Sequence, residues 1–294
     1  YRGRPHSLRV DIQPVDVGPG AKLHAKVLLV VHDQAVRLVV GSANLTENGY
    51  RKNREVAAVI DVTYKEPSAS NLIKDAIRGF ETVLGSWVND SAGHILSSAR
   101  ERLDSWSSGN SGDEQEWFVW SGGDVQLWRE YLKRWPSGEL IERITIVSPF
   151  WSPEESAGPI SLFVKAISDA GAMPSSGMEL RLLTEARAGV DGVYVPSFGA
   201  GIPHVPGEIK GLRATAHAVD PSVSPDEIQM EGFAATRALH AKVVLLEGKN
   251  TALAYMGSAN FSRHGWGFGR GIANVEAGIV VLRAGKQRDR KSVV

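Results

Sequence analysis

Short apolar runs rich in valine and leucine recur along the chain and are bounded by glycine and polar residues. The stretches 23–31 and 239–246 have the composition and length of strands that are buried between two layers. Each is followed by two further strand-like runs. These second and third runs lie at 35–40 and 55–62 after the first stretch, and at 251–256 and 276–282 after the second. The pattern therefore predicts three consecutive strands in each of two regions.

Between the two regions the apolar pattern becomes helical. Apolar residues within 68–88 recur every three to four positions, which predicts an amphipathic helix. Four further elements are predicted before the second region: a tryptophan-rich helix at 125–135, a strand at 141–148, a helix at 161–170 and a strand at 179–184. This alternation of strands and helices predicts an α/β layered sandwich.

The stretch 105–113 is rich in serine and glycine, a composition typical of a linker. We place a domain boundary near residue 112. The predicted domains are therefore 1–112 and 113–294.

An internal repeat relates the two regions. The repeated segments are Leu-His-Ala-Lys-Val at 23–27 and 239–243, Gly-Ser-Ala-Asn at 41–44 and 257–260, and Asn-x-Glu at 53–55 and 274–276. The second copy has a short insertion in its glycine-rich stretch, which indicates a loop. Two copies so far apart do not form a solenoid, whose period is at most about 50 residues. We expect two homologous domains that face each other and share a paired site.

The two copies differ in what precedes them. The second His-x-Lys segment follows more than a hundred residues of its own domain, but only a short stretch precedes the first one. The first domain therefore lacks equivalents of the predicted strands at 141–148 and 179–184. Because the first residue is Tyr1 and not methionine, we expect that the natural protein extends further at its N-terminus.

Composition narrows the class of protein. Of 294 residues, 33 are Lys or Arg and 33 are Asp or Glu, so the formal net charge is zero, which argues against a general polyanion binder. The absence of cysteine excludes disulfides, thiolate-ligated metals and cysteine nucleophiles. No run approaches the roughly 20 apolar residues of a spanning helix, and no signal sequence is recognisable. We predict a soluble, cytoplasmic, globular protein.

The repeated polar residues indicate phosphate chemistry. His24 and Lys26 share one face of a strand, as do His240 and Lys242, because side chains two positions apart point the same way. One imidazole can attack phosphorus while the other protonates the leaving oxygen. The lysines, with Asn44 and Asn260 from the adjacent turns, can neutralise the remaining phosphate oxygens. This chemistry requires no metal ion and no cofactor.

Other residues of the repeat have supporting roles in this interpretation. Glu55 and Glu276 can accept a hydrogen bond from the far ring nitrogen of a histidine and raise its basicity. Ser42 and Ser258 can supply hydroxyl groups, and serine or asparagine in the repeated turn can cap the following helix.

These motifs resemble the phospholipase D superfamily, whose signature is a paired His-x-Lys followed by Gly-Ser-x-Asn. The resemblance implies two α/β sandwich domains in a pseudo-twofold arrangement and a covalent phosphohistidine intermediate without a metal. It assigns His24 as the nucleophile, His240 as the general acid and base, and Lys26, Lys242, Asn44 and Asn260 as the phosphate-binding residues. Ser42, Ser258, Glu55 and Glu276 are then the supporting residues.

One departure from the superfamily pattern concerns the substrate. The aspartate usually found five residues after each lysine is replaced by Val31 and Glu247. The tyrosyl-DNA phosphodiesterase branch also lacks this aspartate, and the segment 258–267 resembles the Ser-Ala-Asn-x-Ser and Trp-Gly pattern of that branch. The resemblance favours nucleic acid as the substrate.

Aromatic residues and one histidine near the second motif are further candidates. His264 and Trp266, with Phe268, are predicted to lie on a glycine-flanked loop that contacts the substrate. The segment 148–151 ends a predicted strand and is expected at the rim of the cleft. The basic run at 283–291 is either a solvated tail or a contact for a phosphate backbone.

The leading hypothesis is a metal-independent phosphodiesterase that acts on nucleic acid, with DNA favoured, as a nuclease or an end-processing enzyme. The alternatives are a phospholipase or phosphatidyltransferase that acts on phospholipid, and a non-catalytic phosphate-binding module of a larger assembly. Because both motifs lie in one chain, a monomer can complete the site.

Overall fold

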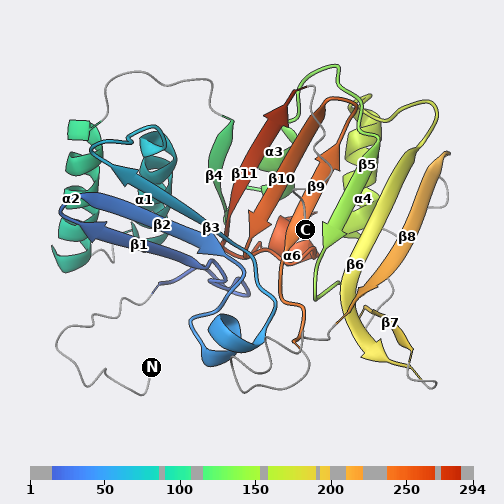
Figure 1. The fold of residues 1–294 in the computed structure, drawn as a ribbon, viewed down its shortest axis with the longest axis horizontal. Coiled ribbons are helices and arrows are strands. Elements are labelled where there is room, and N and C mark those ends of the chain that lie inside the picture. The colour runs from blue at the N-terminus through green and yellow to red at the C-terminus, as the bar shows by residue number, and fades with distance from the viewer. Residues whose placement is uncertain are drawn as a thin grey trace.

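The structure, a computed structural model, describes residues 15–85, 90–106, 115–152, 158–189, 193–198, 210–220, 237–268 and 273–285. The described residues form two sheets, one of three strands and one of eight, with helices packed on both (Figure 1).

The first sheet is antiparallel and has the strand order β1-β2-β3. Its strands are β1 (Val27–His32), β2 (Ala35–Gly41) and β3 (Ala57–Thr63), and two helices follow, α1 (Ser70–Leu84) and α2 (Asp90–Trp106). Alternate residues of β2 point into a core that the apolar faces of both helices complete. The sheet and the two helices therefore form one layered unit.

The second sheet has the order β4-β11-β10-β9-β5-β6-β7, and β8 also pairs with β6. Its strands are β4 (Glu116–Ser121), β5 (Arg143–Val147), β6 (Met178–Ala188), β7 (Tyr194–Ser197), β8 (Leu212–Val219), β9 (Val243–Glu247), β10 (Thr251–Gly257) and β11 (Glu276–Ala284). The helices α3 (Leu127–Leu132), α4 (Pro159–Asp169) and α6 (Arg263–Trp266) pack into one core against this sheet.

The two cores meet at the second sheet. Val280 of β11 faces the core that contains α3 and α4, whereas Ala277 and Ile279 of the same strand face the core of the first unit. Phe118 of β4 joins them there. Strand β11 therefore has a buried residue on each of its two faces, and α1 lies against β4.

The internal repeat is a structural repeat. Strands β1, β2 and β3 are joined in the same antiparallel order as β9, β10 and β11. Val27 lies opposite Val40, and Val243 lies opposite Met256, which occupy matching positions in the two copies. The predicted three-strand units are therefore present in both copies with the same register.

The surroundings of the two repeated strands differ. Strand β9 lies between β10 and β5, whereas β1 pairs with β2 alone within the described part of the chain. Leu28 and Val30 of β1 are 50% and 43% exposed, but the equivalent Val244 and Leu246 of β9 are 2% and 0% exposed. The prediction that the first strand is buried between layers is wrong for one of its faces. Val27, Leu29 and Val31 pack against the core of the first unit, but no described element covers the face that carries Leu28 and Val30.

Several element bounds differ from the sequence prediction. The tryptophan-rich helix predicted at 125–135 is helical only at Leu127–Leu132. Helix α2 and strands β4, β7 and β8 were not predicted. The predicted boundary near residue 112 lies outside the described residues, as does most of the basic run at 283–291.

Candidate active site

Each His-x-Lys segment is extended and ends just before its strand, so the motif residues precede β1 and β9 and are not within them. The segment of one copy lies beside the third strand of the other copy. Leu23 forms a parallel bridge with Val275, and Leu239 forms one with Arg54. The His24 amide donates to the Val275 carbonyl over 2.9 Å. The two copies of the motif are therefore joined by backbone hydrogen bonds.

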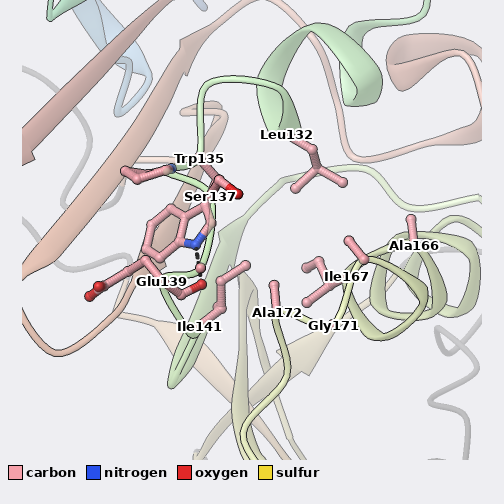
Figure 2. Close-up of a pocket in the computed structure, with 12 residues that line it drawn as sticks. Leu132, Trp135, Ser137, Glu139, Ile141, Ala166, Ile167, Gly171 and Ala172 are labelled. Atoms are coloured by element: carbon pink, nitrogen blue, oxygen red, sulfur yellow. Dashed lines mark hydrogen bonds between the residues drawn. The ribbon is translucent and has the colours of Figure 1, made fainter.

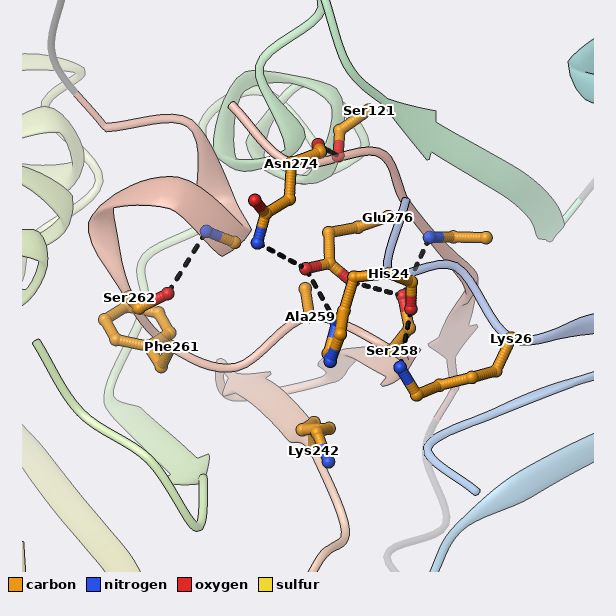
Figure 3. A network of polar contacts seen from close by, with 12 residues as sticks. His24, Lys26, Ser121, Lys242, Ser258, Ala259, Phe261, Ser262, Asn274 and Glu276 are labelled. Atoms are coloured by element: carbon orange, nitrogen blue, oxygen red, sulfur yellow. Dashed lines mark hydrogen bonds and ion pairs between the residues drawn. The ribbon is translucent and has the colours of Figure 1, made fainter. Parts of the chain in front are cut away.

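The histidines and glutamates pair across the two copies. The Nδ1 atom of His24 lies 2.9 Å from a carboxylate oxygen of Glu276, and Nδ1 of His240 lies 2.8 Å from a carboxylate oxygen of Glu55 (Figure 3 shows the first pair). A carboxylate accepts a hydrogen bond, so Nδ1 of each ring carries the proton in the neutral form. The other ring nitrogen, Nε2, is then available as a nucleophile or a base.

Each carboxylate has further hydrogen-bond donors. The buried hydroxyls of Ser42 and Ser258 donate to Glu55 and Glu276, both over 2.5 Å. The side-chain amide of Asn53 donates to Glu55 over 3.2 Å, and the equivalent amide of Asn274 donates to Glu276 over 3.3 Å. The expected supporting roles of these serines and glutamates fit this geometry.

These donors also favour the ionised form of the carboxylate. Burial raises the pKa of Glu55, but the hydrogen bonds from His240, Ser42 and Asn53 outweigh burial, so that the pKa lies below its ordinary value. An ionised Glu55 accepts the hydrogen bond from Nδ1 of His240 and so holds the ring in one orientation and one tautomer.

Sequence reasoning assigned no role to Asn53 and Asn274. Both stand two positions before the repeated glutamate, in matching positions of the two copies. The repeated Asn-x-Glu spacing was the available signal for them, because side chains two positions apart on an extended segment lie on one side.

The two lysines lie between the copies. Lys26 Nζ donates to the His24 carbonyl over 2.7 Å, and Lys242 Nζ donates to the His240 carbonyl over 2.6 Å. Lys242 is completely buried, and burial lowers its pKa to about 7, while Glu55 and Glu276 raise it and the nearby Lys26 lowers it further. Burial also lowers the pKa of Lys26. Two lysine amines therefore lie close together, and a bound anion would favour the protonated form of both.

The glycine of each Gly-Ser-Ala-Asn turn is required by close backbone contact. A Cβ atom on Gly41 would lie 2.5 Å from the Val56 carbonyl oxygen, and one on Gly257 would lie 2.3 Å from the Ala277 carbonyl oxygen. This close approach places each following serine beside its glutamate.

The asparagines of the two turns have different surroundings. Asn44 is exposed, whereas Asn260 is half-buried. The Oδ1 atom of Asn260 is buried and has no hydrogen-bond partner among the described residues. A buried polar atom without a partner is rare, and an amide group so placed is available for a ligand.

The helix that follows the second turn is not capped by the turn itself. Ser258 is bonded to Glu276, and the α6 cap is Ser262, whose Oγ accepts from the Gly265 amide over 3.1 Å. The expected capping by a residue of the repeated turn is therefore wrong for the second copy.

The three loop candidates differ in exposure. His264 is exposed. Trp266 is completely buried and Phe268 is 3% exposed, so the structure does not place either side chain on a substrate-contacting surface, contrary to the prediction. Trp266 packs against an aromatic cluster, with its ring 5.0 Å from Tyr255 and 5.2 Å from Phe261 between centroids. The flanking glycines permit tight packing of this segment, and they do not expose it.

Phe150 lies at the rim of the site, as expected for the segment 148–151. Its ring is in edge-on contact with His240, with 6.3 Å between centroids, and it is 57% exposed. Among the described residues, Phe150 is the aromatic side chain whose ring contacts a motif histidine.

A separate pocket of about 250 Å³ lies between α3 and α4 (Figure 2). Its wall includes Trp135, whose Nε1 donates to the Glu139 carbonyl over 2.9 Å. None of the motif residues lines it.

The described residues contain neither a cluster that could hold a metal ion nor a helix that could span a membrane. No three of their His, Asp and Glu side chains are arranged to hold a metal ion. None of the helices within them is both long and apolar enough to cross a membrane.

Comparisons with known proteins give the class of fold. The chain has a phospholipase D-like fold, as the paired motifs predicted. Yeast tyrosyl-DNA phosphodiesterase is similar in structure, with a TM-score of 0.52 and 12% identity, and the match covers 93% of this chain and 70% of the yeast chain. No protein-family model and no curated protein sequence matches the chain.

Two further solved structures are more distant. A mutant of the same yeast enzyme gives a TM-score of 0.49 at 11% identity, over 91% of this chain and 68% of that chain. Polyphosphate kinase from Porphyromonas gingivalis gives a TM-score of 0.40 at 12% identity, over 90% of this chain and 31% of that chain.

Proposed function

We propose that the protein is a phosphodiesterase that acts on nucleic acid, with DNA as the favoured substrate. The observation that carries the proposal is the crossed pairing of His24 with Glu276 and of His240 with Glu55. A histidine whose Nδ1 is bonded to a carboxylate presents the free lone pair of Nε2, and two such histidines provide a nucleophile and an acid.

In the first step, Nε2 of His24 attacks phosphorus and forms a P–N bond. The bond from phosphorus to the leaving oxygen breaks, and protonated His240 gives its proton to that oxygen. In the second step, His240 takes a proton from water, the water oxygen attacks phosphorus, and the P–N bond breaks. His24 is thereby regenerated. The geometry is similar for both histidines, so these separate roles rest on the superfamily resemblance.

The remaining motif residues bind the substrate in this proposal. Lys26 and Lys242 neutralise the non-bridging phosphate oxygens, and the amides of Asn44 and Asn260 donate hydrogen bonds to them. No step of this mechanism needs a metal ion or a cofactor.

Support for DNA comes from the fold comparison. The yeast neighbour is a tyrosyl-DNA phosphodiesterase, and the structural match covers 93% of this chain. The zero net charge does not oppose this substrate, because a local cationic site can coexist with a neutral total.

The test is cleavage of end-labelled single-stranded DNA in excess EDTA. We expect the wild-type protein to cleave it, and His24→Ala and His240→Ala to lose at least about 10³-fold in rate. His217→Ala is the control, because His217 bonds to Thr215 on exposed β8. With an activated phosphodiester whose phosphate is labelled, the His240→Ala variant should accumulate the covalent phosphohistidine intermediate, detected as label on His24.

Each other outcome contradicts a stated part of the proposal. Activity that EDTA abolishes contradicts the metal-independent mechanism. Cleavage of phospholipid in vesicles without cleavage of DNA contradicts nucleic acid as the substrate and indicates phospholipid instead. If neither is cleaved but phosphate binds, the non-catalytic module is the correct reading.

A further inference from the structure

The exposure of Phe150 contrasts with the residues around it. Ser148 is completely buried and Trp151 is 7% exposed, whereas Phe150 is 57% exposed. Full burial of such a side chain stabilises a protein, and here much of that stabilisation is absent. An exposed aromatic ring at the rim of a site is available to a ligand.

The backbone that carries Phe150 is held on both sides. Ser148 Oγ donates to the Phe150 carbonyl over 2.8 Å and accepts from the Phe261 amide over 3.0 Å. Trp151 Nε1 donates to Thr184 Oγ1 over 3.1 Å. Ser148 thus connects this segment to the one that follows the second motif turn. The exposed position of the ring is therefore built into the fold and does not reflect a loose loop.

The ring lies beside His240 and not beside His24. Its plane is inclined at 80° to the imidazole, with 6.3 Å between centroids. Because Nδ1 of His240 is bonded to Glu55, the reactive atom of this ring is Nε2. In the proposed mechanism His240 protonates the leaving oxygen. A group attached to that oxygen therefore comes close to Phe150.

We propose that Phe150 determines specificity by stacking on the nucleobase of the leaving nucleotide. This inference rests on the proposed function and extends it to the leaving side of the substrate. Aromatic side chains bind bases by stacking with little dependence on sequence, because every base presents a planar face. The protein should then prefer a substrate whose leaving nucleotide carries a base.

The test uses dinucleotides that contain a single phosphodiester bond. The parent has two bases, and two analogues have an abasic residue in place of one nucleotide or the other. The leaving side is the fragment released without phosphate. We expect kcat/KM of the wild-type protein to fall about 5- to 100-fold when the leaving nucleotide is abasic, the range that base stacking provides. An abasic residue on the retained side should have little effect.

Substitution of Phe150 identifies the source of this preference. Phe150→Ala should remove the preference and leave the rate on the leaving-side abasic substrate unchanged, and Phe150→Trp should retain the preference. Tyr64→Ala is the matched control, because Tyr64 is 69% exposed and lies outside the motif segments. The pH profile of Phe150→Ala on the abasic substrate should match that of the wild-type protein.

Three outcomes would overturn the inference. If Phe150→Ala lowers the rates on all substrates equally or shifts the pH profile, the ring merely positions His240. If the wild-type protein cleaves all three dinucleotides at equal rates, no base is recognised on the leaving side, although the proposed function stands. If it cleaves none of them while also failing to cleave longer DNA, the proposed function fails together with this inference.

Discussion

At the scale of single residues, each glutamate of the site holds three side chains at once. Glu276 accepts from His24, Ser258 and Asn274, and Glu55 is bonded in the same way in the other copy. A carboxylate with so many donors keeps its histidine in one tautomer and one orientation. In the proposed mechanism the glutamates are therefore positioning residues, and their effect on the reaction passes through the histidines.

We expect Glu276→Gln and Glu55→Gln each to lower kcat by about 10²- to 10⁴-fold, because an amide does not enforce the same histidine tautomer. Single-turnover kinetics should separate them. Glu276→Gln should slow the formation of the phosphohistidine on His24, and Glu55→Gln should alter the pH profile of leaving-group protonation. Glu47→Gln is the control, since its side chain is 62% exposed. A loss below threefold in either glutamine variant would contradict the orienting role.

Lys242 predicts a pH dependence of stability. Its folded pKa of about 7 lies below the ordinary 10.5, so between these pH values the unfolded chain binds a proton that the folded chain does not. Stability then rises with pH through this window, and the penalty for burying the charged lysine is fully present below pH 7. We expect Lys242→Met to be more stable than the wild-type protein at pH 6, by about 3 to 5 kcal/mol.

The measurement is urea unfolding at pH 6 and pH 9, where the advantage of Lys242→Met should be smaller at pH 9. The groups that act on Lys242 are Lys26, Glu55 and Glu276, so Lys26 and both glutamates stay unchanged. Lys165→Met, at a site 67% exposed, should show no such difference. A methionine variant that is less stable at both pH values would refute the prediction.

Residues of the repeat were predictable because the same polar types recur at the same spacing, which core packing does not require. Trp266 was not predictable in this way. Its burial depends on rings from distant parts of the chain, such as Tyr131 and Phe163, which no local pattern reveals. Phe150 was expected at the rim, but its contact with His240 needed the fold.

At the scale of elements, the strands of the repeat were predicted to within a few residues because their apolar runs are continuous. Helix α2 was missed because its buried side is narrow and is formed mainly by Leu96, Ala99 and Leu103 among polar residues. Strand β8 was missed because most of its side chains are exposed. The apolar pattern of one strand does not show which elements will pack beside it, so the exposure of Leu28 and Val30 on β1 could not be predicted.

The equivalent strands β1 and β9 predict unequal mutational effects. Leu246 of β9 is completely buried, so Leu246→Ala should destabilise the protein by about 2 to 5 kcal/mol through loss of contacts and formation of a cavity. Leu28 of β1 is 50% exposed, and we expect Leu28→Ala to cost less than about 1.5 kcal/mol. Denaturant unfolding measures both. Equal losses would show that β1 is covered in solution.

At the scale of the whole molecule, the two copies are joined at the candidate active site. The Arg54 amide donates to the Ala238 carbonyl over 2.8 Å, and the Val275 amide donates to the Lys22 carbonyl over 2.9 Å. A core shared between α1, α2 and β11 adds apolar contact. Separation of the copies therefore breaks both histidine–glutamate pairs at once.

Native-state hydrogen exchange can test this coupling. The amide protons of His24, Arg54, His240 and Val275 all donate across the junction. We expect the four to exchange with the same opening free energy, within about 0.5 kcal/mol, because one event exposes them all. The amide of Leu253, within the second sheet, is the comparison. Protection that differs more than tenfold between His24 and His240 would indicate that the two sides of the junction open independently.

The crossed histidine–glutamate pairs also determine when, during translation of the chain, the proposed activity can begin. His24 emerges from the ribosome early, but its carboxylate partner Glu276 is the last of the four paired residues to be translated. Until then a nascent chain carries at most one oriented histidine, whereas two are needed for one turnover. If the proposed function is correct, the protein therefore stays inert while it is attached to its own polysome.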